Sequence, residues 1–448
     1  MKKMIKNKIS VVGLGKLGLP LVACFASRGF KVIGIDINKE VVDAVNKGKS
    51  PIVEPKLAEF ILKFKKNIIT TQNHDEAIKK TDITYIIVAT PSDMKGNFSN
   101  AYVESAVKSL AKSFGKNKKK YHLFVISSTV MPGSTEKRFI PLIEKYSGRK
   151  LNTDFGLCYV PDFVALGNVI DNFLNPDLVV IGQSDKFAGD QLIPIYKKLC
   201  KNKPYIARMS IISGEIAKIA LNNYITLKMS FANFLANLCE KIPGADVDAI
   251  TRAIGSDKRI SPYYIKGGLS FGGTCFPRDT KAFQIFLRKY NYRPELIRAV
   301  EKINKFQDKH LSDIVFKNLS LIRDKKVSIL GLSFKPNTAV ITESPAIKLI
   351  HSLLERNVKI AVYDPLAMNN TKNIFGNKIQ YTKSIRDCFS RSSCWVITTP
   401  DKKFKKINDS FVAKSPTVII DCWRILNPQK FSKKIKYIKW GYYKEKDN

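Results

Sequence analysis

The feature that most constrains the fold of this chain is a glycine-rich turn near its N-terminus. A short β-branched run ending at Val12 leads into Gly13, Gly15 and Gly18, and Asp36 ends the next such run. In this setting Gly13 permits a tight turn, Gly15 lets the backbone approach a pyrophosphate, and Gly18 lets a helix pack closely on a strand. The N-terminus of that helix supplies the partial positive charge that favours the pyrophosphate. The spacing therefore predicts a dinucleotide-binding domain whose Asp36 bonds the adenosine ribose and repels a 2′-phosphate, so that NAD is favoured over NADP.

Short β-branched runs alternate with helical segments in two parts of the chain, which is typical of α/β domains with a doubly wound parallel sheet. The first part has expected strands at 9–12, 31–35, 83–88, 123–127, 156–160 and 178–181. The second has expected strands at 327–330, 359–363, 394–398 and 417–421, with a final strand within 431–443. We therefore expect an NAD-binding Rossmann domain at 1–205, a central helical region at 206–320 for dimerisation and the catalytic loop, and a second Rossmann-like domain at 321–448.

Between the two alternating parts, residues 213–240 form a long helical pattern without proline. Apolar residues occupy most faces of this pattern, which predicts a helix buried on all sides. Such a helix is expected between two domains, between two subunits, or both.

Charge and cysteine usage limit the other classes of protein. The formal net charge is +38, but the lysines are spread over the whole chain and no known nucleic-acid-binding module is present, so a nucleic-acid or membrane-surface partner is the less favoured alternative.

The eight cysteines form no Cys-x-x-Cys pair and the four histidines are isolated, which argues against a metal site or a disulfide framework. No apolar run reaches the roughly 20 residues of a membrane helix, and the basic segment 1–8 leads directly into a strand instead of a secretory signal. We expect a cytoplasmic protein.

One cysteine lies in an unusual local sequence. Cys275 follows Gly-Gly pairs at 267–268 and 272–273, and Asp279 comes four residues after it. Paired glycines make the backbone permissive, and a thiolate both adds to aldehydes and leaves readily from thioesters. The loop predicts a catalytic nucleophile, and a buried structural thiol in a bent loop is the alternative.

Glu215, Lys218 and Asn222 are polar residues at helical spacing on this apolar helix. Lys218 and Asn222 are four residues apart and project from one face. Polar groups on a buried helix are costly unless they have partners. Either they form a structural pair at a subunit interface, or Lys218 stabilises an alkoxide and oxyanion while Asn222 orients substrate or water.

In this chain order the motifs resemble the UDP-glucose/GDP-mannose dehydrogenase family over essentially the full length. The further matches are Pro51-Ile-Val-Glu54-Pro55, Ala89-Thr90-Pro91-Ser92, Ser128-Thr129-Val130-Met-Pro-Gly133, Pro161-Asp162-Phe163, Arg259 and Gly331-Leu-Ser-Phe-Lys335-Pro. The resemblance implies a four-electron oxidation of a sugar C6 alcohol by two NAD, through a thiohemiacetal and a thioester on Cys275. UDP-glucose 6-dehydrogenase, serving polysaccharide precursor synthesis, is the expected activity. A UDP-N-acetylhexosamine or GDP-mannose 6-dehydrogenase, or a non-catalytic homologue that binds NAD and a nucleotide sugar, is the alternative.

The resemblance also implies roles for individual residues. Lys218 and Asn222 assist removal of the hydroxyl proton, and Asp279 and Thr129 hold the hydrolytic water. Arg259 reaches the substrate of the neighbouring subunit, which implies a homodimer, and the C-terminal domain binds the UDP-sugar. Cofactor contacts are expected from Gly13, Gly15, Leu17, Gly18, Asp36, Thr90 and Thr129. Substrate contacts are expected from Asp162, Lys218, Asn222, Arg259, Gly272 and Lys335.

Two positions depart from the family's pattern. Leu166 stands where UDP-glucose enzymes usually carry the second glutamate of Pro-Glu-Phe-x-x-Glu-Gly. Thr342 stands where they usually carry the arginine of Arg-Glu-Ser. The first change removes a carboxylate credited with acid–base help in hydrolysis, and the second removes an arginine expected near the cofactor phosphates.

Overall fold

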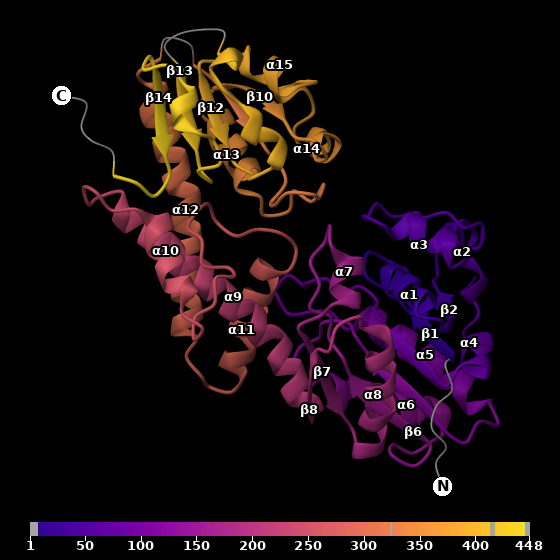
Figure 1. The fold of residues 1–448 in the computed structure, drawn as a ribbon. Helices are drawn as coiled ribbons and strands as arrows, with labels where there is room; N and C mark the ends of the chain where they lie inside the picture. The colour runs from indigo at the N-terminus through magenta and orange to yellow at the C-terminus, as the bar shows by residue number, and fades with distance from the viewer. Residues whose placement is uncertain (1–7, 323–324, 413–416, 444–448) are drawn as a thin grey trace. The chain divides into compact units, whose positions relative to one another are not determined.

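The computed structural model describes residues 8–322, 325–412 and 417–443. The chain divides into two units, Met1–Ala220 and Leu221–Asn448 (Figure 1). The basic segment that precedes Lys8 lies outside the described residues.

The first unit is built on an eight-stranded sheet in the order β3-β2-β1-β4-β5-β6-β7-β8. Neighbouring strands are parallel except β6 and β7, which pair antiparallel. The six expected strands are confirmed to within two residues, and β3 and β8 extend the sheet beyond the prediction. The bounds are β1 Lys8–Val12, β2 Lys31–Ile35, β3 Ile68–Thr71, β4 Ile83–Ile86, β5 His122–Ile126, β6 Phe155–Tyr159, β7 Leu178–Gln183 and β8 Tyr205–Ser210.

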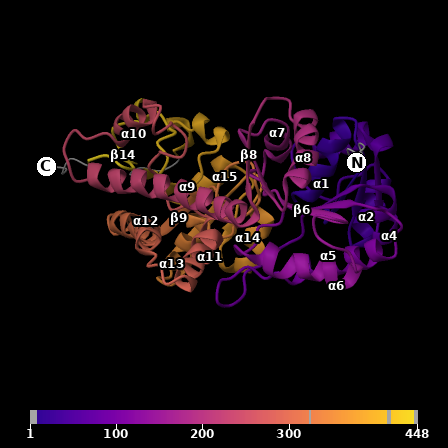
Figure 2. The same cartoon turned by 90° about the horizontal axis from the view of Figure 1, so that it is seen from below.

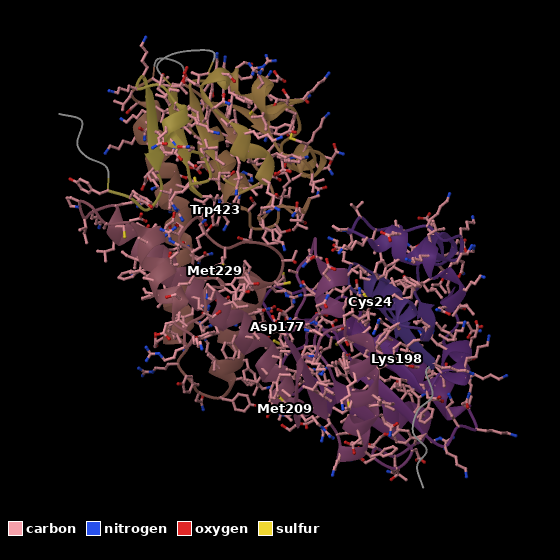
Figure 3. The ribbon with its side chains drawn as sticks, viewed as in Figure 1. Cys24, Asp177, Lys198, Met209, Met229 and Trp423 are labelled. Atoms are coloured by element: carbon pink, nitrogen blue, oxygen red, sulfur yellow. The ribbon has the colours of Figure 1, made fainter. Side chains whose placement is uncertain are left out.

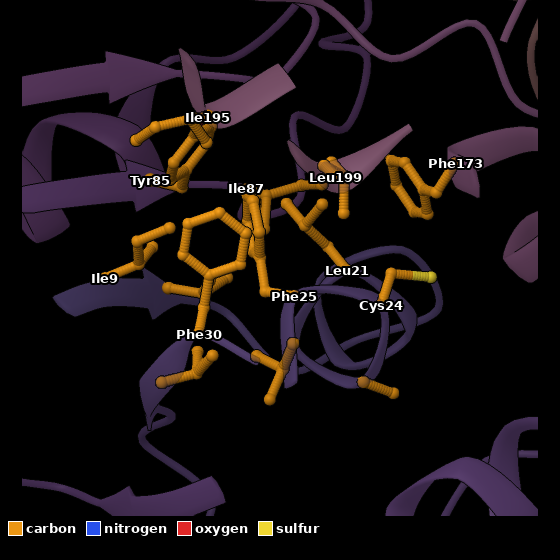
Figure 4. Packing of buried hydrophobic residues seen from close by; sticks show 14 of the residues in the cluster. Ile9, Leu21, Cys24, Phe25, Phe30, Tyr85, Ile87, Phe173, Ile195 and Leu199 are labelled. Carbon is orange, nitrogen blue, oxygen red and sulfur yellow. The ribbon is translucent and has the colours of Figure 1, made fainter. Parts of the chain in front are cut away.

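Helices cover both faces of this sheet. One hydrophobic core lies under α1, α3, α7 and α8, where Phe25 packs against Phe30 and Tyr85 with ring centroids 5.4 and 5.2 Å apart (Figure 4). A second core lies under α4, α5 and α6, and α5 runs beside α6 (Figures 1 and 2). The bounds are α1 Gly18–Ser27, α2 Lys39–Asn46, α3 Leu57–Lys63, α4 His74–Lys80, α5 Ala101–Gly115, α6 Ile140–Ser147, α7 Val169–Leu174 and α8 Lys186–Leu199.

The long helix is confirmed as α9, Ile211–Cys239, but the prediction that it is buried on all sides is wrong for the single chain. Tyr224, Phe231, Phe234 and Leu238 are 60, 45, 51 and 43% exposed. Their spacing of seven, three and four residues places them on one face of the helix. One face of the helix is apolar but is not covered by the rest of the chain. Burial of this face would need a second molecule.

The second unit contains a six-stranded sheet, β11-β10-β9-β12-β13-β14, in which every pair is parallel. This order repeats that of the first six strands of unit 1, so the prediction of two Rossmann-like sheets is confirmed. The strands are β9 Lys326–Leu330, β10 Lys359–Tyr363, β11 Gln380–Tyr381, β12 Cys394–Ile397, β13 Thr417–Asp421 and β14 Ile435–Lys439. The helices are α10 Val247–Ser256, α11 Phe276–Lys289, α12 Glu295–Leu319, α13 Pro345–Leu354, α14 Met368–Phe375 and α15 Ile385–Phe389, and α12 runs beside α13 (Figure 2).

Candidate active site

The turn after β1 has the geometry of a dinucleotide site. Gly13 has φ of 94°, a conformation that L side chains rarely adopt, and its N–H donates to the Ile35 carbonyl at 2.8 Å. The Leu14 N–H donates to Asp36 Oδ2 at 2.7 Å, which fixes the acidic side chain beside the turn. The Asn38 N–H donates to Asp36 Oδ1 at 2.9 Å. Each carboxylate oxygen therefore accepts one backbone bond and keeps a lone pair for a ribose hydroxyl.

The space around the three glycines differs in a way that fits a bound pyrophosphate. A Cβ on Gly13 would lie 2.6 Å from the Ile87 carbonyl oxygen, and one on Gly18 would lie 1.8 Å from the Gly13 carbonyl oxygen. A Cβ on Gly15 would meet nothing within 4 Å. Gly13 and Gly18 are required by the fold, whereas the open side of Gly15 is where a ligand can approach the backbone. Leu17 occupies the N-cap position of α1 and also packs against the core of unit 1.

Thr90 and Thr129 follow β4 and β5, which are neighbours in the sheet. The Thr90 hydroxyl donates to the Thr129 carbonyl at 2.7 Å, so the structure brings these two predicted residues together. Ligands of doubly wound sheets bind beyond the carboxyl ends of the strands, which is where both threonines lie.

Lys218 and Asp162 also meet in unit 1. Lys218 Nζ donates to the backbone carbonyl of Asp162 at 2.6 Å and lies 4.8 Å from the centre of the Phe163 ring. Burial raises the pKa of the Asp162 carboxyl to about 7, although the nearby Lys218 charge opposes the shift. This carboxyl can hold a proton near neutral pH, which suits acid–base work.

Glu215, one turn before Lys218 on α9, has a structural function. It is fully buried and accepts bonds from the Gly133 N–H at 2.5 Å, the Thr135 N–H at 3.0 Å and the Thr135 hydroxyl at 2.6 Å. Glu215 thereby pins the start of α9 to the segment that follows Thr129.

In unit 2, Cys275 occupies the N-cap position of α11 and is exposed, whereas the other seven cysteines are buried. The Asp279 N–H donates to the Cys275 carbonyl at 2.8 Å, so the helix begins at the cysteine. A helix N-terminus carries partial positive charge, which stabilises negative charge that develops there. The alternative of a buried structural thiol at Cys275 does not fit this exposure.

Asn222 and Asp279 are hydrogen-bonded partners. Asn222 Nδ2 donates to Asp279 Oδ2 at 2.6 Å, and Arg278 lies 3.2 Å from the other carboxylate oxygen. The Asp279 side chain is only 1% exposed. The structure thus brings together two of the predicted catalytic side chains and places one of them a helical turn after the thiol.

Two asparagines that the sequence did not indicate hold the loop before Cys275. Asn233 accepts from the Gly268 N–H at 2.8 Å and donates to the Leu269 carbonyl at 3.2 Å. Asn304 accepts from the Phe271 N–H at 2.7 Å and donates to the same residue's carbonyl at 3.1 Å. The signal for Asn233 was available, because a polar stripe runs along α9 at three- and four-residue spacing through Asn222, Thr226, Ser230 and Asn233.

The glycines of this loop are packed too closely for a side chain. A Cβ on Gly268 would lie 2.6 Å from the ring of Trp423, which is labelled in Figure 3. A Cβ on Gly272 would lie 2.2 Å from the Glu343 carbonyl oxygen. The neighbouring Thr342 carbonyl accepts from the Gly273 N–H at 2.9 Å. The segment that departs from the family's pattern therefore packs directly on the loop that carries the thiol.

Lys335 and Arg259 differ in their surroundings. Lys335 Nζ lies 5.7 Å from the centre of the Phe334 ring, and that ring packs on Gly273. Arg259 follows α10, its side chain is 87% exposed, and it pairs with the neighbouring Asp257 at 2.6 Å. The structure therefore places Lys335 next to the Cys275 loop, while the Arg259 side chain extends into solvent.

The second sheet repeats the glycine turn and the following aspartate of the first, but the carboxylate of this aspartate is taken up by hydrogen bonds within the chain. Gly331 has φ of 91° and its N–H donates to the Tyr363 carbonyl at 2.9 Å. Asp364 Oδ2 accepts from the Leu332 N–H at 2.7 Å and from both the N–H and the hydroxyl of Ser333 at 3.2 Å. Its Oδ1 accepts two further backbone N–H groups, at 2.8 and 2.7 Å. With five bonds accepted, this carboxylate supports the turn instead of binding a ribose.

Comparison with known proteins agrees with this geometry. Residues 7–200, 213–306 and 328–428 match the NAD binding, central and UDP binding domains of the UDP-glucose/GDP-mannose dehydrogenase family. The chain is 33% identical to the UDP-glucose 6-dehydrogenase of Haloferax volcanii over 421 residues, which cover 94% of this chain and 97% of that protein. It is also 33% identical to the GDP-mannose 6-dehydrogenase of Azotobacter vinelandii over 361 residues, 80% of this chain and 81% of that protein. The solved UDP-glucose dehydrogenase of the archaeon Pyrobaculum islandicum matches with a TM-score of 0.88 at 29% identity over 98% of both chains.

The chain belongs to the UDP-glucose/GDP-mannose dehydrogenase family. It is therefore an NAD-dependent nucleotide-sugar dehydrogenase, and the predicted family and cofactor are confirmed. No helix in the described part of the chain is long and apolar enough to cross a membrane.

Proposed function

We propose that this family member is a UDP-glucose 6-dehydrogenase that oxidises the C6 alcohol to a carboxylate through a covalent intermediate on Cys275. The observation that carries the proposal is the exposed thiol at the start of α11, one turn before the buried Asn222–Asp279 pair. Support for the sugar comes from the full-length similarity to a UDP-glucose 6-dehydrogenase. The three parts proposed for it are an NAD domain at 1–205, a central region at 206–320 and a UDP-sugar domain at 321–448.

The proposed first steps are the oxidation of the C6 alcohol and the addition of the Cys275 thiol. NAD, when bound, accepts a hydride from C6 in each of the two oxidation steps. Lys218 and Asn222 assist removal of the hydroxyl proton in the first step, which leaves an aldehyde. The Cys275 sulfur then bonds to the aldehyde carbon, and the thiol proton is passed to the new oxygen, giving a thiohemiacetal.

Loss of the second hydride, together with the hydroxyl proton, converts the thiohemiacetal to a thioester. Water held by Asp279 and Thr129 adds to the thioester carbon, and the carbon–sulfur bond breaks to release the acid and the thiol. Lys218 stabilises the oxyanion that forms in this step. Leu166 stands in place of the glutamate that usually assists hydrolysis. Asp162, whose pKa is raised to about 7 by burial, is suited to take up the proton instead.

The proposed enzyme is a homodimer formed through the exposed face of α9. This face presents Tyr224, Phe231, Phe234 and Leu238, and the rings of Phe231 and Phe234 stack with centroids 6.4 Å apart. Aromatic residues are enriched in the cores of subunit interfaces. In such a dimer the solvent-exposed Arg259 is available to the substrate of the neighbouring subunit.

The proposal is tested with purified protein, NAD and a panel of UDP-glucose, UDP-N-acetylhexosamines and GDP-mannose. We expect two NADH for each acid formed, with UDP-glucose the best substrate. Preference for another sugar would contradict the assigned substrate, and no turnover with any sugar would favour a binding protein. The Cys275→Ser variant should retain NAD and substrate binding but lose steady-state turnover, because an ester is hydrolysed far less readily than a thioester. Near-normal turnover in that variant would exclude covalent catalysis.

A further inference from the structure

The connection between α11 and α12 forms a hollow that the proposed oxidation does not use. Its volume is 480 Å³, within the range of about 300–1,000 Å³ that small-molecule sites occupy. It is lined by Arg288, Asn291, Tyr292, Arg293, Pro294, Glu295 and Arg298. None of these residues belongs to the predicted cofactor or substrate sets.

The hollow carries a strong excess of positive charge. Three arginines line it against a single carboxylate, Glu295. Arg298 lies 3.7 Å from Glu295, but their side chains are 52 and 65% exposed, so this contact is weak. Among the described residues, the side chains of Arg288 and Arg293 make no hydrogen bond or ion pair. One guanidinium group can bind two oxygens of a phosphate at once. Three arginines in one hollow therefore match a ligand with several phosphates.

The backbone that presents these arginines is held by hydrogen bonds. The Asn291 N–H donates to the Arg288 carbonyl at 3.0 Å, and the Tyr292 N–H donates to the Leu287 carbonyl at 3.0 Å. Asn291 takes φ of 55°, the left-handed conformation that commonly ends a helix. Arg288 lies in α11, Arg298 lies in α12, and Arg293 lies in the connection between them. The backbone that carries the arginines is therefore defined, which lowers the cost of ordering the site when a ligand binds.

An aromatic ring lies in the same hollow. Tyr292 is 67% exposed although most of a tyrosine ring is apolar. Exposed aromatic rings beside basic groups are the arrangement on which nucleobases stack. The hollow thus combines an anion-binding part with a flat apolar surface.

We propose that the α11–α12 hollow binds a nucleoside polyphosphate, with its phosphates on Arg288, Arg293 and Arg298 and its base on Tyr292. A nucleotide fits better than an acidic peptide, because the charge and the ring converge in one small hollow instead of following a groove. This site goes beyond the proposed oxidation, and binding to it is measured without turnover, so the two proposals can fail separately.

The test is calorimetric titration of the whole protein, presaturated with NADH and UDP so that the family's nucleotide sites are filled. The probes are ATP, tripolyphosphate and adenosine. We expect one ATP per chain and at least 10-fold weaker binding of adenosine. The paired substitution Arg288→Ala/Arg293→Ala should weaken ATP at least 30-fold. Tyr292→Ala should weaken ATP about 5- to 150-fold, as expected for a lost stacking contact, and leave tripolyphosphate unchanged.

Lys309→Ala is the matched control, because it removes an exposed charge from α12 outside the hollow and should leave every affinity unchanged. All the substituted side chains are exposed, so thermal unfolding should match that of the unsubstituted protein. Equal ATP affinity in the arginine variant, or no ATP binding, would overturn the proposal. Tighter binding of hexaglutamate than of ATP at the same arginines would overturn it in favour of an acidic protein partner.

Discussion

Substituting Gly15 and Gly18 separately distinguishes binding from folding in the turn after β1. A Cβ on Gly15 would meet nothing within 4 Å, whereas one on Gly18 would lie 1.8 Å from the Gly13 carbonyl oxygen. Gly15→Ala should therefore leave the apoprotein folded and place its methyl group where the pyrophosphate approaches. Gly18→Ala should force the start of α1 away from β1.

The expected magnitudes follow from these contacts. An unstrained glycine-to-alanine change stabilises a protein by about 0.4–1 kcal/mol, which corresponds to a rise in Tm of about 1–4 °C for a unit of this size. Loss of one charge-assisted bond from the turn to the pyrophosphate costs about 1.5–3 kcal/mol, so Gly15→Ala should weaken NAD about 10- to 150-fold. Overpacking against backbone costs about 3 kcal/mol in Gly18→Ala, which lowers Tm by about 6–12 °C.

Thermal unfolding of the two variants without ligand, followed by calorimetric titration with NAD, measures both effects. The unsubstituted protein serves as the reference for each. Gly15→Ala that binds NAD with unchanged affinity would refute the assignment of the open side of Gly15 to the pyrophosphate. Gly18→Ala with an unchanged Tm would refute the packing argument itself.

Three further substitutions test other parts of the structure. Burial raises the pKa of Glu215 from 4.5 to about 7, so its contribution to stability is present below pH 4.5 and is lost as the pH rises to 7. Between pH 4.5 and 8 the free energy of unfolding of the Glu215→Gln variant should fall by about 3 kcal/mol less than that of the unsubstituted protein, as measured by denaturant titration at each pH. If the free energies of unfolding of the two proteins change in parallel with pH, this expectation is contradicted. Asp279→Asn removes the charge that Asn222 and Arg278 contact, so steady-state assays should show turnover reduced about 100-fold or more, with NAD affinity kept. Phe234→Glu places a charge on the exposed face of α9 and should give monomers in light scattering, whereas an intact dimer would place the interface elsewhere.

The sequence predicted the strands that are buried and β-branched, together with the edge strand β14, and it missed the other three edge strands, β3, β8 and β11. β8, Tyr205–Ser210, contains Arg208 and is only partly buried, so it shows neither a continuous apolar run nor clean alternation. β11 has two residues, which is too short for any periodicity. These strands form through hydrogen bonds to a neighbour that is distant in the chain, and local composition does not record that pairing.

The candidate site was predictable where chemistry constrains residue type. The sequence indicated Cys275 with Asp279, because a thiol in a glycine-rich loop is unusual. It indicated Asn222 because a polar group on an apolar helix is costly unless it has a partner. Asn233 and Asn304 did not stand out, because each acts only through the backbone groups that it meets in the folded loop. For α9 the sequence left burial within one chain and burial between two subunits as alternatives, because an apolar pattern does not distinguish them.

Asp36 and Asp364 follow equivalent strands and accept the N–H of equivalent leucines, both at 2.7 Å. Asp36 retains lone pairs, whereas the carboxylate of Asp364 accepts five bonds. In a saturation mutagenesis library scored for both protein abundance and growth, the two positions should therefore separate. Changes at Asp36 should mainly alter cofactor choice among chains that still accumulate, and changes at Asp364 should remove the chain from the soluble pool.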